Sequence, residues 1–255
     1  MSGHSKWSQI KRQKGVADAR RGQAFTKAAN AITISAKAGG GNPETNFKLR
    51  LAVEAARTIN MPKENIERAI ARGVGGAKEG YQLAEITYEG FGPAGVGILV
   101  EAVTDNRLRT AQEVRSVFER TGGRLSGAGS VDHLFKPIGE IVVRSQGELD
   151  SDQLLLLAAE AGAEDIESDE NEAIVYCQIA DLEKVKEALA ASGLEIIEAR
   201  ISRGPASLVR ISDEKDAAAI LSLVNKLDDL PDVQKVYANF DIPEELLLRS
   251  TEIKN

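Results

Sequence analysis

The residues best suited to chemistry are the cations crowded at the amino end of this 255-residue chain. They are Lys6, Lys11, Arg12, Lys14, Arg20, Arg21 and Lys27, with Asp18 as the only acid among them. Closely spaced cations neutralise phosphates, because each contact releases a counterion condensed on a nucleic acid. Trp7 lies inside this cluster, where its ring could stack on an unpaired base. The alternative is a solvated basic face with Trp7 packed into a bundle; the pattern favours nucleic-acid contact without distinguishing DNA from RNA.

The distribution of charge supports this interpretation. The whole chain has a net charge of −7, which by itself argues against a polyanionic partner. Residues 1–78, however, hold 15 Lys/Arg against 5 Asp/Glu, a net of +10, and the remainder has a net of −17. Such asymmetry between parts of one chain is typical of proteins that contact nucleic acids or membranes.

A second candidate site is the segment Thr104–Thr110, between an apolar stretch and a helical pattern. Asp105 or Asn106 is a natural N-cap for the helix that follows. Arg107 and Arg109 would lie in the first turn, where the helix dipole favours acids. An anion between them would remove this conflict, and either a phosphate or an internal carboxylate would serve. The two arginines are therefore a candidate anion site, with a purely structural role equally open.

Other reactive groups are scarce. The histidines are His4 and His133, with His133 predicted in a strand, and the lone Cys177 is predicted to be buried as a small hydrophobic residue. No Cys/His spacing fits a zinc site. The glycine-rich segments 90–95 and 122–129 lack a phosphate-loop lysine and are typical of turns. The sequence therefore predicts a non-enzymatic protein with no catalytic residues, metal or cofactor.

The sequence also indicates the compartment. The start MSGHSKWSQIKRQK has no apolar segment of the kind found in a secretory signal. The longest apolar run, Leu154–Ala159, is far shorter than the ~20 residues of a membrane helix. A single cysteine cannot form an internal disulfide and fits a reducing compartment. We expect a soluble, cytoplasmic protein.

Helices should carry the basic cluster. Apolar residues at helical spacing predict three short helices within residues 16–72, with breaks at Gly39–Pro43 and before Pro62. Residues 1–14 hold few large apolar groups and are predicted to be a mobile arm. Residues 73–80 are predicted to be a linker. The first domain is therefore assigned to residues 1–78.

After residue 80 the period changes to that of strands. Two strands (86–89 and a central one at 96–104), a helix (107–121) and a strand (130–135) are followed by a series with the order βαββαβ, which is the ferredoxin-like pattern. That series covers 140–144, 151–161, 163–167, 172–178, 181–191 and 194–201, and a helix at 214–227 and a strand at 233–240 follow it.

These patterns predict an α+β fold: an N-terminal three-helix bundle plus two α/β domains, the third ferredoxin-like and inserted into the second. The second domain is discontinuous, at residues 79–137 and 204–255, and the inserted domain covers 138–203. The insert has a net charge of −11. A nucleic-acid backbone would repel it, so it is predicted to contact protein or to hold the tail away from the polyanion.

Several segments together resemble the YebC/PmpR family of bacterial proteins, which includes a mitochondrial translational activator. They are Gly3–Trp7, Phe25–Lys27, Asn60–Ile70, Tyr88–Pro93, Thr104–Arg107 and Gly129–Val131. The resemblance implies three domains, the first of them helical. It also places Lys6, Trp7, Lys11, Lys14, Arg21 and Lys27 on the family's basic N-terminal motif.

The resemblance implies a regulatory protein that binds nucleic acid. Members are commonly described as probable DNA-binding transcriptional regulators. The mitochondrial branch and some bacterial members point instead to translation on the ribosome, with ribosomal RNA or tRNA as the target. The chain departs from the family at Arg12 and Gln13, at Asn30–Ala31, and at Leu108, where a polar residue is usual. This last departure predicts that Leu108 packs, leaving the two arginines as the polar groups.

Overall fold

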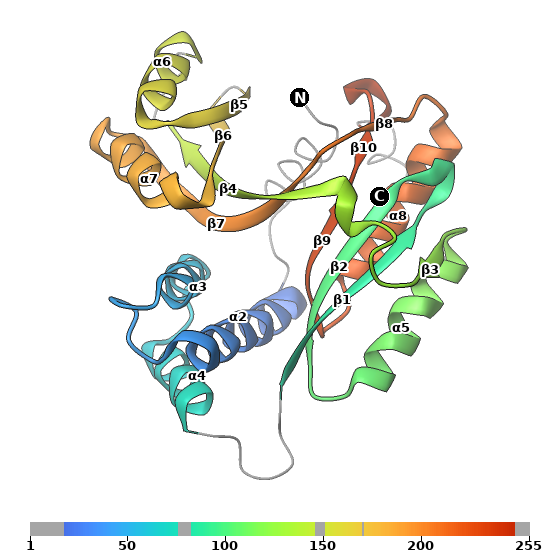
Figure 1. Cartoon of the computed structure of the whole chain (residues 1–255), viewed down its shortest axis with the longest axis horizontal. Helices are drawn as coiled ribbons and strands as arrows, with labels where there is room; N and C mark the ends of the chain where they lie inside the picture. Colours follow the sequence, from blue (N-terminus) through green and yellow to red (C-terminus); the bar gives the residue numbers. More distant parts are fainter. Residues whose placement is uncertain (1–17, 76–82, 146–150, 170, 248–255) are drawn as a thin grey trace. The chain divides into compact units, whose positions relative to one another are not determined.

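Two compact units make up the chain, and the computed structural model in Figure 1 describes residues 18–75, 83–145, 151–169 and 171–247. The first unit comprises Met1–Phe135 and Pro205–Asn255, and the second is Lys136–Gly204. Helices and mostly antiparallel strands both contribute to the described chain, with a helical segment at its start. The predicted α+β class is therefore confirmed.

The amino-terminal part of the first unit forms three helices, as predicted: α2 (Asp18–Gly39), α3 (Phe47–Thr58) and α4 (Lys63–Val74). Each helix has apolar residues every three or four positions, so one face can be buried. Helices α3 and α4 both pack against α2. The core consists of Ile32, Ala36, Leu49, Val53, Ala56, Met61, Ile66 and Ala69. We call residues 18–75 the helical module.

Two local contacts hold the helices of this module together. Asn46 caps α3 by accepting the Leu49 N–H at 3.1 Å, and its Nδ2 donates to the carbonyls of Ser35 and Gly40 at 2.8 Å. At Gly73 α4 approaches α2 so closely that an added Cβ would lie 2.5 Å from the Thr33 carbonyl oxygen. Only glycine permits such an approach. These contacts fix how α3 and α4 pack against α2.

The rest of the first unit is built on a four-stranded antiparallel sheet with the order β3-β1-β2-β9. Its elements are β1 (Ala84–Phe91), η1 (Pro93–Gly95), β2 (Gly97–Thr104), α5 (Arg107–Arg120), β3 (Arg124–Ser126), α8 (Glu214–Asp228) and β9 (Val233–Ala238). Ile98 of β2 joins a core with Phe118 of α5 and Leu223 of α8. Leu99 packs on the opposite face with Tyr237. Strand β2 is thus central, as predicted.

The predicted strand at residues 130–135 is wrong. Asp132–Leu134 forms a 3-10 turn, η2, and the third strand of the sheet is β3. Val131 and Leu134 are three residues apart, which is the repeat of a 3-10 turn, and both pack around Leu99. The two-residue strand β8 (Val209–Arg210), which pairs with β10 (Phe240–Asp241), was not predicted. Strands this short carry no alternating pattern.

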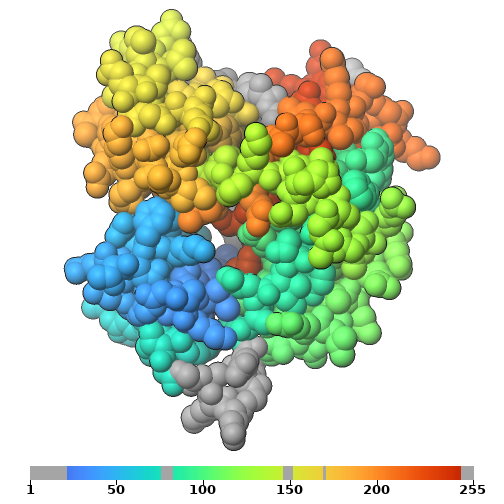
Figure 2. Space-filling model, viewed as in Figure 1, coloured from blue at the N-terminus to red at the C-terminus, as the bar shows by residue number. Residues whose placement is uncertain are grey.

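The second unit has the predicted order βαββαβ. Its elements are β4 (Phe135–Arg144), α6 (Ser151–Ala161), β5 (Ala163–Asp169), β6 (Glu172–Cys177), η3 (Ile179–Asp181), α7 (Leu182–Ala191) and β7 (Glu195–Pro205). The sheet order is β5-β6-β4-β7, and β6 runs antiparallel to both of its neighbours. This is the ferredoxin-like arrangement. Helices α6 and α7 contact each other, and α6, in yellow in Figure 2, lies at the surface of the unit.

Candidate nucleic-acid interface

Most of the predicted amino-terminal cluster lies outside the described residues. Five of its members fall there: Lys6, Trp7, Lys11, Arg12 and Lys14. Arg20 and Arg21 belong to the start of α2, but their side chains also lie outside the described part. Their contact with a nucleic acid stays a prediction.

Lys27 is the one predicted contact residue whose side chain is described, and it has an internal partner. Its Nζ donates to the Asp228 carbonyl at 2.5 Å and lies 3.6 Å from the Asp228 carboxylate. One turn earlier, Gln23 donates to the Asp229 carbonyl at 2.5 Å. Both carbonyls belong to the C-terminal end of α8, where unpaired oxygens attract donors and positive charge. Lys27 therefore caps α8, in addition to any role in binding.

The helical module exposes further cations that the sequence-based site omitted. They are Lys37, Lys48, Arg57, Lys63, Arg68 and Arg72. The prediction relied on crowding along the sequence, whereas these residues are dispersed. Their signal was the helical period: Arg68 and Arg72 are four residues apart on α4 and both are exposed, whereas Ile66 and Ala69 are buried. Neither arginine forms an ion pair with a described residue.

Acids on the same helix reduce this charge without reversing it. Glu64 and Glu67 are exposed on α4, and Glu67 lies 3.6 Å from Lys63. Residues 22–75 nevertheless hold eight Lys/Arg against four Asp/Glu. By contrast, Arg50 is only half-exposed, because it donates to the Pro43 carbonyl at 3.3 Å and covers the Phe47 ring. The described helical module thus has a positive surface even without the amino-terminal cluster.

The second candidate site is organised by a carboxylate that lies far away in the sequence. Asn106 is the N-cap of α5, and its Oδ1 accepts the Arg109 N–H at 3.1 Å. One oxygen of Asp232, just before β9, accepts from Arg109 at 2.7 Å, Thr110 at 2.7 Å and Thr104 at 3.0 Å. An internal carboxylate, one of the two alternatives that the sequence left open, therefore lies against Arg109.

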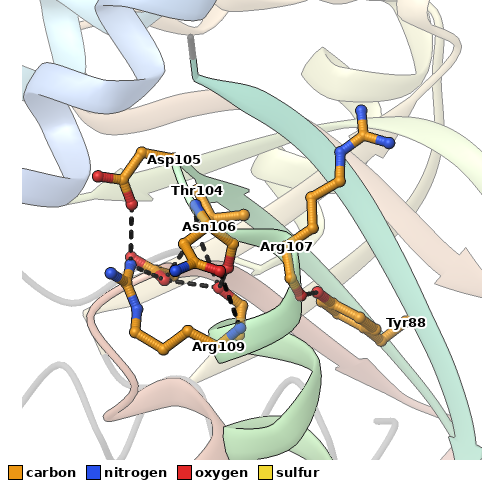
Figure 3. A network of polar contacts seen from close by, with 8 residues as sticks. Tyr88, Thr104, Asp105, Asn106, Arg107 and Arg109 are labelled. Atoms are coloured by element: carbon orange, nitrogen blue, oxygen red, sulfur yellow. Dashed lines mark hydrogen bonds and ion pairs between the residues drawn. The ribbon is translucent and has the colours of Figure 1, made fainter. Parts of the chain in front are cut away.

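Asp105 completes this network, and Arg107 takes no part in it. The Arg109 guanidinium also contacts Asp105 at 3.0 Å. Figure 3 shows the Arg107 side chain extending away from Arg109 and from the Tyr88 ring. The Tyr88 hydroxyl donates to the Arg107 carbonyl at 3.4 Å, and the Arg107 side chain itself is exposed. The structure does not bring the two guanidinium groups together around one anion.

The prediction that Leu108 packs is wrong, because its side chain is 78% exposed. It occupies the second position of α5, between two arginines that point to different sides. The buried residues of α5 begin only at Thr110, so Leu108 lies before the part of the helix that packs on the core. No described element covers its side chain. Leu108 and Arg107 are thus exposed together at the start of α5.

The polar network around Asp232 has a testable effect on stability. Burial alone would raise the pKa of Asp232, but hydrogen bonds from Arg109, Thr110 and Thr104 outweigh it, so the pKa is lowered. We expect Asp232→Ala to lower the free energy of unfolding by about 1–3 kcal/mol, because the hydrogen bonds from Arg109, Thr110 and Thr104 to a charged acceptor are lost. Urea unfolding would measure this, with Asp229→Ala, at an exposed carboxylate, as the control. Equal midpoints for the two variants would show that the network contributes nothing.

The glycine segment 122–129 leads into a loop whose amides hold an internal anion. The buried carboxylate of Glu89 accepts the N–H groups of Gly129 at 2.7 Å, Val131 at 2.6 Å and Asp132 at 2.9 Å. Burial alone would raise the pKa of Glu89, but these hydrogen bonds and the nearby His133 lower it overall. Backbone amides arranged in this way can bind phosphates. Here they bind a carboxylate of β1, in agreement with the predicted structural role of the segment.

The described reactive groups offer little for catalysis. Cys177 is fully buried, as predicted, and burial together with Asp181 and Glu164 raises its pKa to about 11. His133 belongs to η2 instead of the predicted strand. Within the described ranges, no group of three or more His, Cys, Asp or Glu side chains could hold a metal ion. None of the helices described there is long and apolar enough to span a membrane.

Comparisons with known proteins cover almost the whole chain. Residues 5–76 match the TACO1/YebC protein N-terminal domain, and residues 83–240 match the TACO1/YebC second and third domain. A relative from Chloroflexus aurantiacus is 50% identical over 251 residues, which are 98% of this chain and 99% of that one. A relative from Dictyoglomus turgidum is 48% identical over 247 residues, 97% of this chain and 98% of that one. Both carry the name probable transcriptional regulatory protein.

A solved structure agrees with the sequence matches. The crystal structure of the conserved hypothetical protein Aq1575 from Aquifex aeolicus is 46% identical and superimposes with a TM-score of 0.84. The match covers 90% of this chain and 94% of the other. The motifs, the order of domains and the fold all point to one group of regulatory proteins, and the chain belongs to the TACO1/YebC family.

Proposed function

We propose that this chain is a non-enzymatic, cytoplasmic regulator that binds nucleic acid through the helical module and the basic residues preceding it. The best-supported target is DNA, in transcriptional regulation. The observation that carries the proposal is the separation of charge. Residues 1–78 have a net charge of +10, whereas the compact unit Lys136–Gly204 holds 6 Lys/Arg against 16 Asp/Glu. The names of the relatives support regulation of transcription.

The described contacts support a surface for the phosphate backbone. The exposed guanidinium groups of Arg68 and Arg72 share one face of α4 and have no ion-pair partner among the described residues. Contacts of this kind position a protein on a nucleic acid without reading its sequence. Glu64 and Glu67 are exposed on the same helix, and their carboxylates would repel any phosphate that approached them. We therefore expect an affinity that depends strongly on salt and weakly on sequence.

The double change Arg68→Glu and Arg72→Glu should weaken binding by about tenfold or more and lower the slope of log K against log[salt] by roughly 2. Fluorescence anisotropy with labelled duplex DNA would measure both effects. The matched control is Arg115→Glu with Arg120→Glu, two exposed arginines on α5 that undergo the same change of charge. If both double variants lost affinity equally, net charge would explain the loss and the helical module would not be the binding surface.

RNA on the ribosome is a second candidate target, favoured by the acidic unit. A net charge of −10 on Lys136–Gly204 is repelled by an extended duplex. The same charge is favourable where basic proteins and RNA lie side by side, as they do on a ribosome. In this alternative the helical module contacts ribosomal RNA or tRNA, and the acidic unit contacts protein.

Sedimentation separates the two targets. Cell lysate is run through a sucrose gradient at low and at high salt, and the protein is followed by immunoblot. Migration with free protein at both salts, together with a footprint on promoter DNA, is expected for the DNA regulator. Salt-sensitive migration with ribosomes that the Arg68/Arg72 variant loses would replace that proposal with the translation role.

A further inference from the structure

Helix α6 of the second unit presents large apolar side chains to solvent. Leu155 is 55% exposed and Leu156 is 67% exposed, while Leu154 and Ala158 on the other face are buried. Exposed leucines are common singly, but two neighbours on one face form a patch. The patch faces outward on a helix that already uses its other side against the unit's own core.

The exposed residues of α6 form a regular stripe along the helix. Asp152, Leu155, Leu156, Ala159 and Glu160 are all exposed, and they recur at intervals of three and four residues. Residues with this spacing lie on one face, which is the pattern by which one helix packs against another. The centre of the stripe is apolar, and an acid lies at each end.

Charge decides what can occupy this face. A second copy of the chain packing α6 against α6 would place Asp152 and Glu160 beside acids of its partner, whether the helices ran parallel or antiparallel. The second unit of each copy also has a net charge of −10, so two such units repel each other. A nucleic acid is excluded for the same reason. The complementary occupant is apolar along its centre and basic at its borders.

We propose that the exposed face of α6 is a docking site for an amphipathic helix of another protein, with a leucine-type ridge bordered by Lys and Arg. Leu155 and Leu156 would pack against the leucine ridge of the partner helix, while Asp152 and Glu160 would face its cations. A single helix face is small compared with a standard protein interface, so the contact is weak and depends on salt. The inference does not depend on which nucleic acid the helical module binds.

The test uses the full chain and designed peptides. The probe is a labelled amphipathic peptide of about 18 residues, or five helical turns, with a leucine ridge and Lys/Arg borders. Two matched peptides replace the leucines with Ala or the basic residues with Glu. Anisotropy should show that only the leucine-and-basic peptide binds the wild-type chain. The double change Leu155→Gln and Leu156→Gln should weaken that binding by about tenfold or more, which is 1.4 kcal/mol or more.

Two further variants keep the test decisive. Leu108→Gln with Leu208→Gln removes two exposed leucines of the first unit and should leave peptide binding unchanged. Asp152→Asn with Glu160→Gln keeps the leucines and should weaken binding mainly at low salt, which controls for any folding defect of the leucine variant. The proposal would be overturned if all variants bound the leucine-and-basic peptide as tightly as the wild type does. It would also be overturned if the wild type bound the Glu-bordered peptide as tightly as the leucine-and-basic one. A wild-type dimer in sedimentation equilibrium that the Leu155/Leu156 variant loses would overturn it as well, because the face would then bind a second copy.

Discussion

The triple change Lys11→Glu, Lys14→Glu and Arg21→Glu should weaken binding to duplex DNA or structured RNA by roughly 100-fold or more at about 150 mM salt. Each lost cation removes one released counterion, so the slope of log K against log[salt] should fall by roughly 3. Titrations at several salt concentrations, followed by anisotropy, would give both quantities. Lys27 is left unchanged, because its ammonium caps α8 through Asp228 and a carboxylate there would face that acid.

The control for this variant carries the same change of charge elsewhere. Arg115→Glu, Arg120→Glu and Lys215→Glu alter three exposed cations of the first unit outside the helical module. Their affinity should stay within a few-fold of wild type, and thermal melting should be similar for both triple variants. Undiminished affinity in the amino-terminal variant would refute the predicted contact surface. A loss in both variants would indicate attraction to net charge alone.

The change Glu89→Gln should lower the free energy of unfolding by about 2–4 kcal/mol, because a charge-assisted acceptor is replaced and one amide N–H then faces an N–H₂ group. Glu89 is only 5% exposed, so water cannot readily replace the lost hydrogen bonds. Urea unfolding would measure the loss. Hydrogen exchange should be faster at the amides of Gly129, Val131 and Asp132, because in the wild type these N–H groups donate hydrogen bonds to the carboxylate.

The difference in stability between the wild type and Glu89→Gln should depend on pH in one direction. The pKa of Glu89 is lower in the folded state than in the unfolded chain, where a glutamate titrates near pH ~4.3. Its contribution is therefore complete above that pH and is lost as the pH falls through the folded pKa. The difference between wild type and Glu89→Gln should shrink in acid. Glu85→Gln, at an exposed position on the same strand, should show little difference at any pH, and an equal loss there would contradict the role assigned to Glu89.

Local repeats in the sequence were enough to predict most of the fold. The three helices of the module, the central strand β2 and the βαββαβ order of the second unit all follow from apolar spacing and from glycine or proline breaks. These patterns involve only a few neighbouring residues, so they can be recognised without knowledge of the tertiary structure. The strand predicted at 130–135 failed because Val131 and Leu134 pack as a 3-10 turn on the sheet. Strand β3 is too short to show any period.

The sequence by itself determined the separation of charge, because net charge depends only on composition along the chain. Which cations have internal partners was decided by tertiary structure: Lys27 contacts Asp228 and Arg109 contacts Asp232, partners more than a hundred residues away. The loop amides that resemble a phosphate cradle are filled by Glu89 for the same reason. Contacts between distant residues leave no local pattern, since each partner is an ordinary polar residue in its own segment. Only the folded chain shows that Arg107, Leu108 and the α6 leucines are left uncovered.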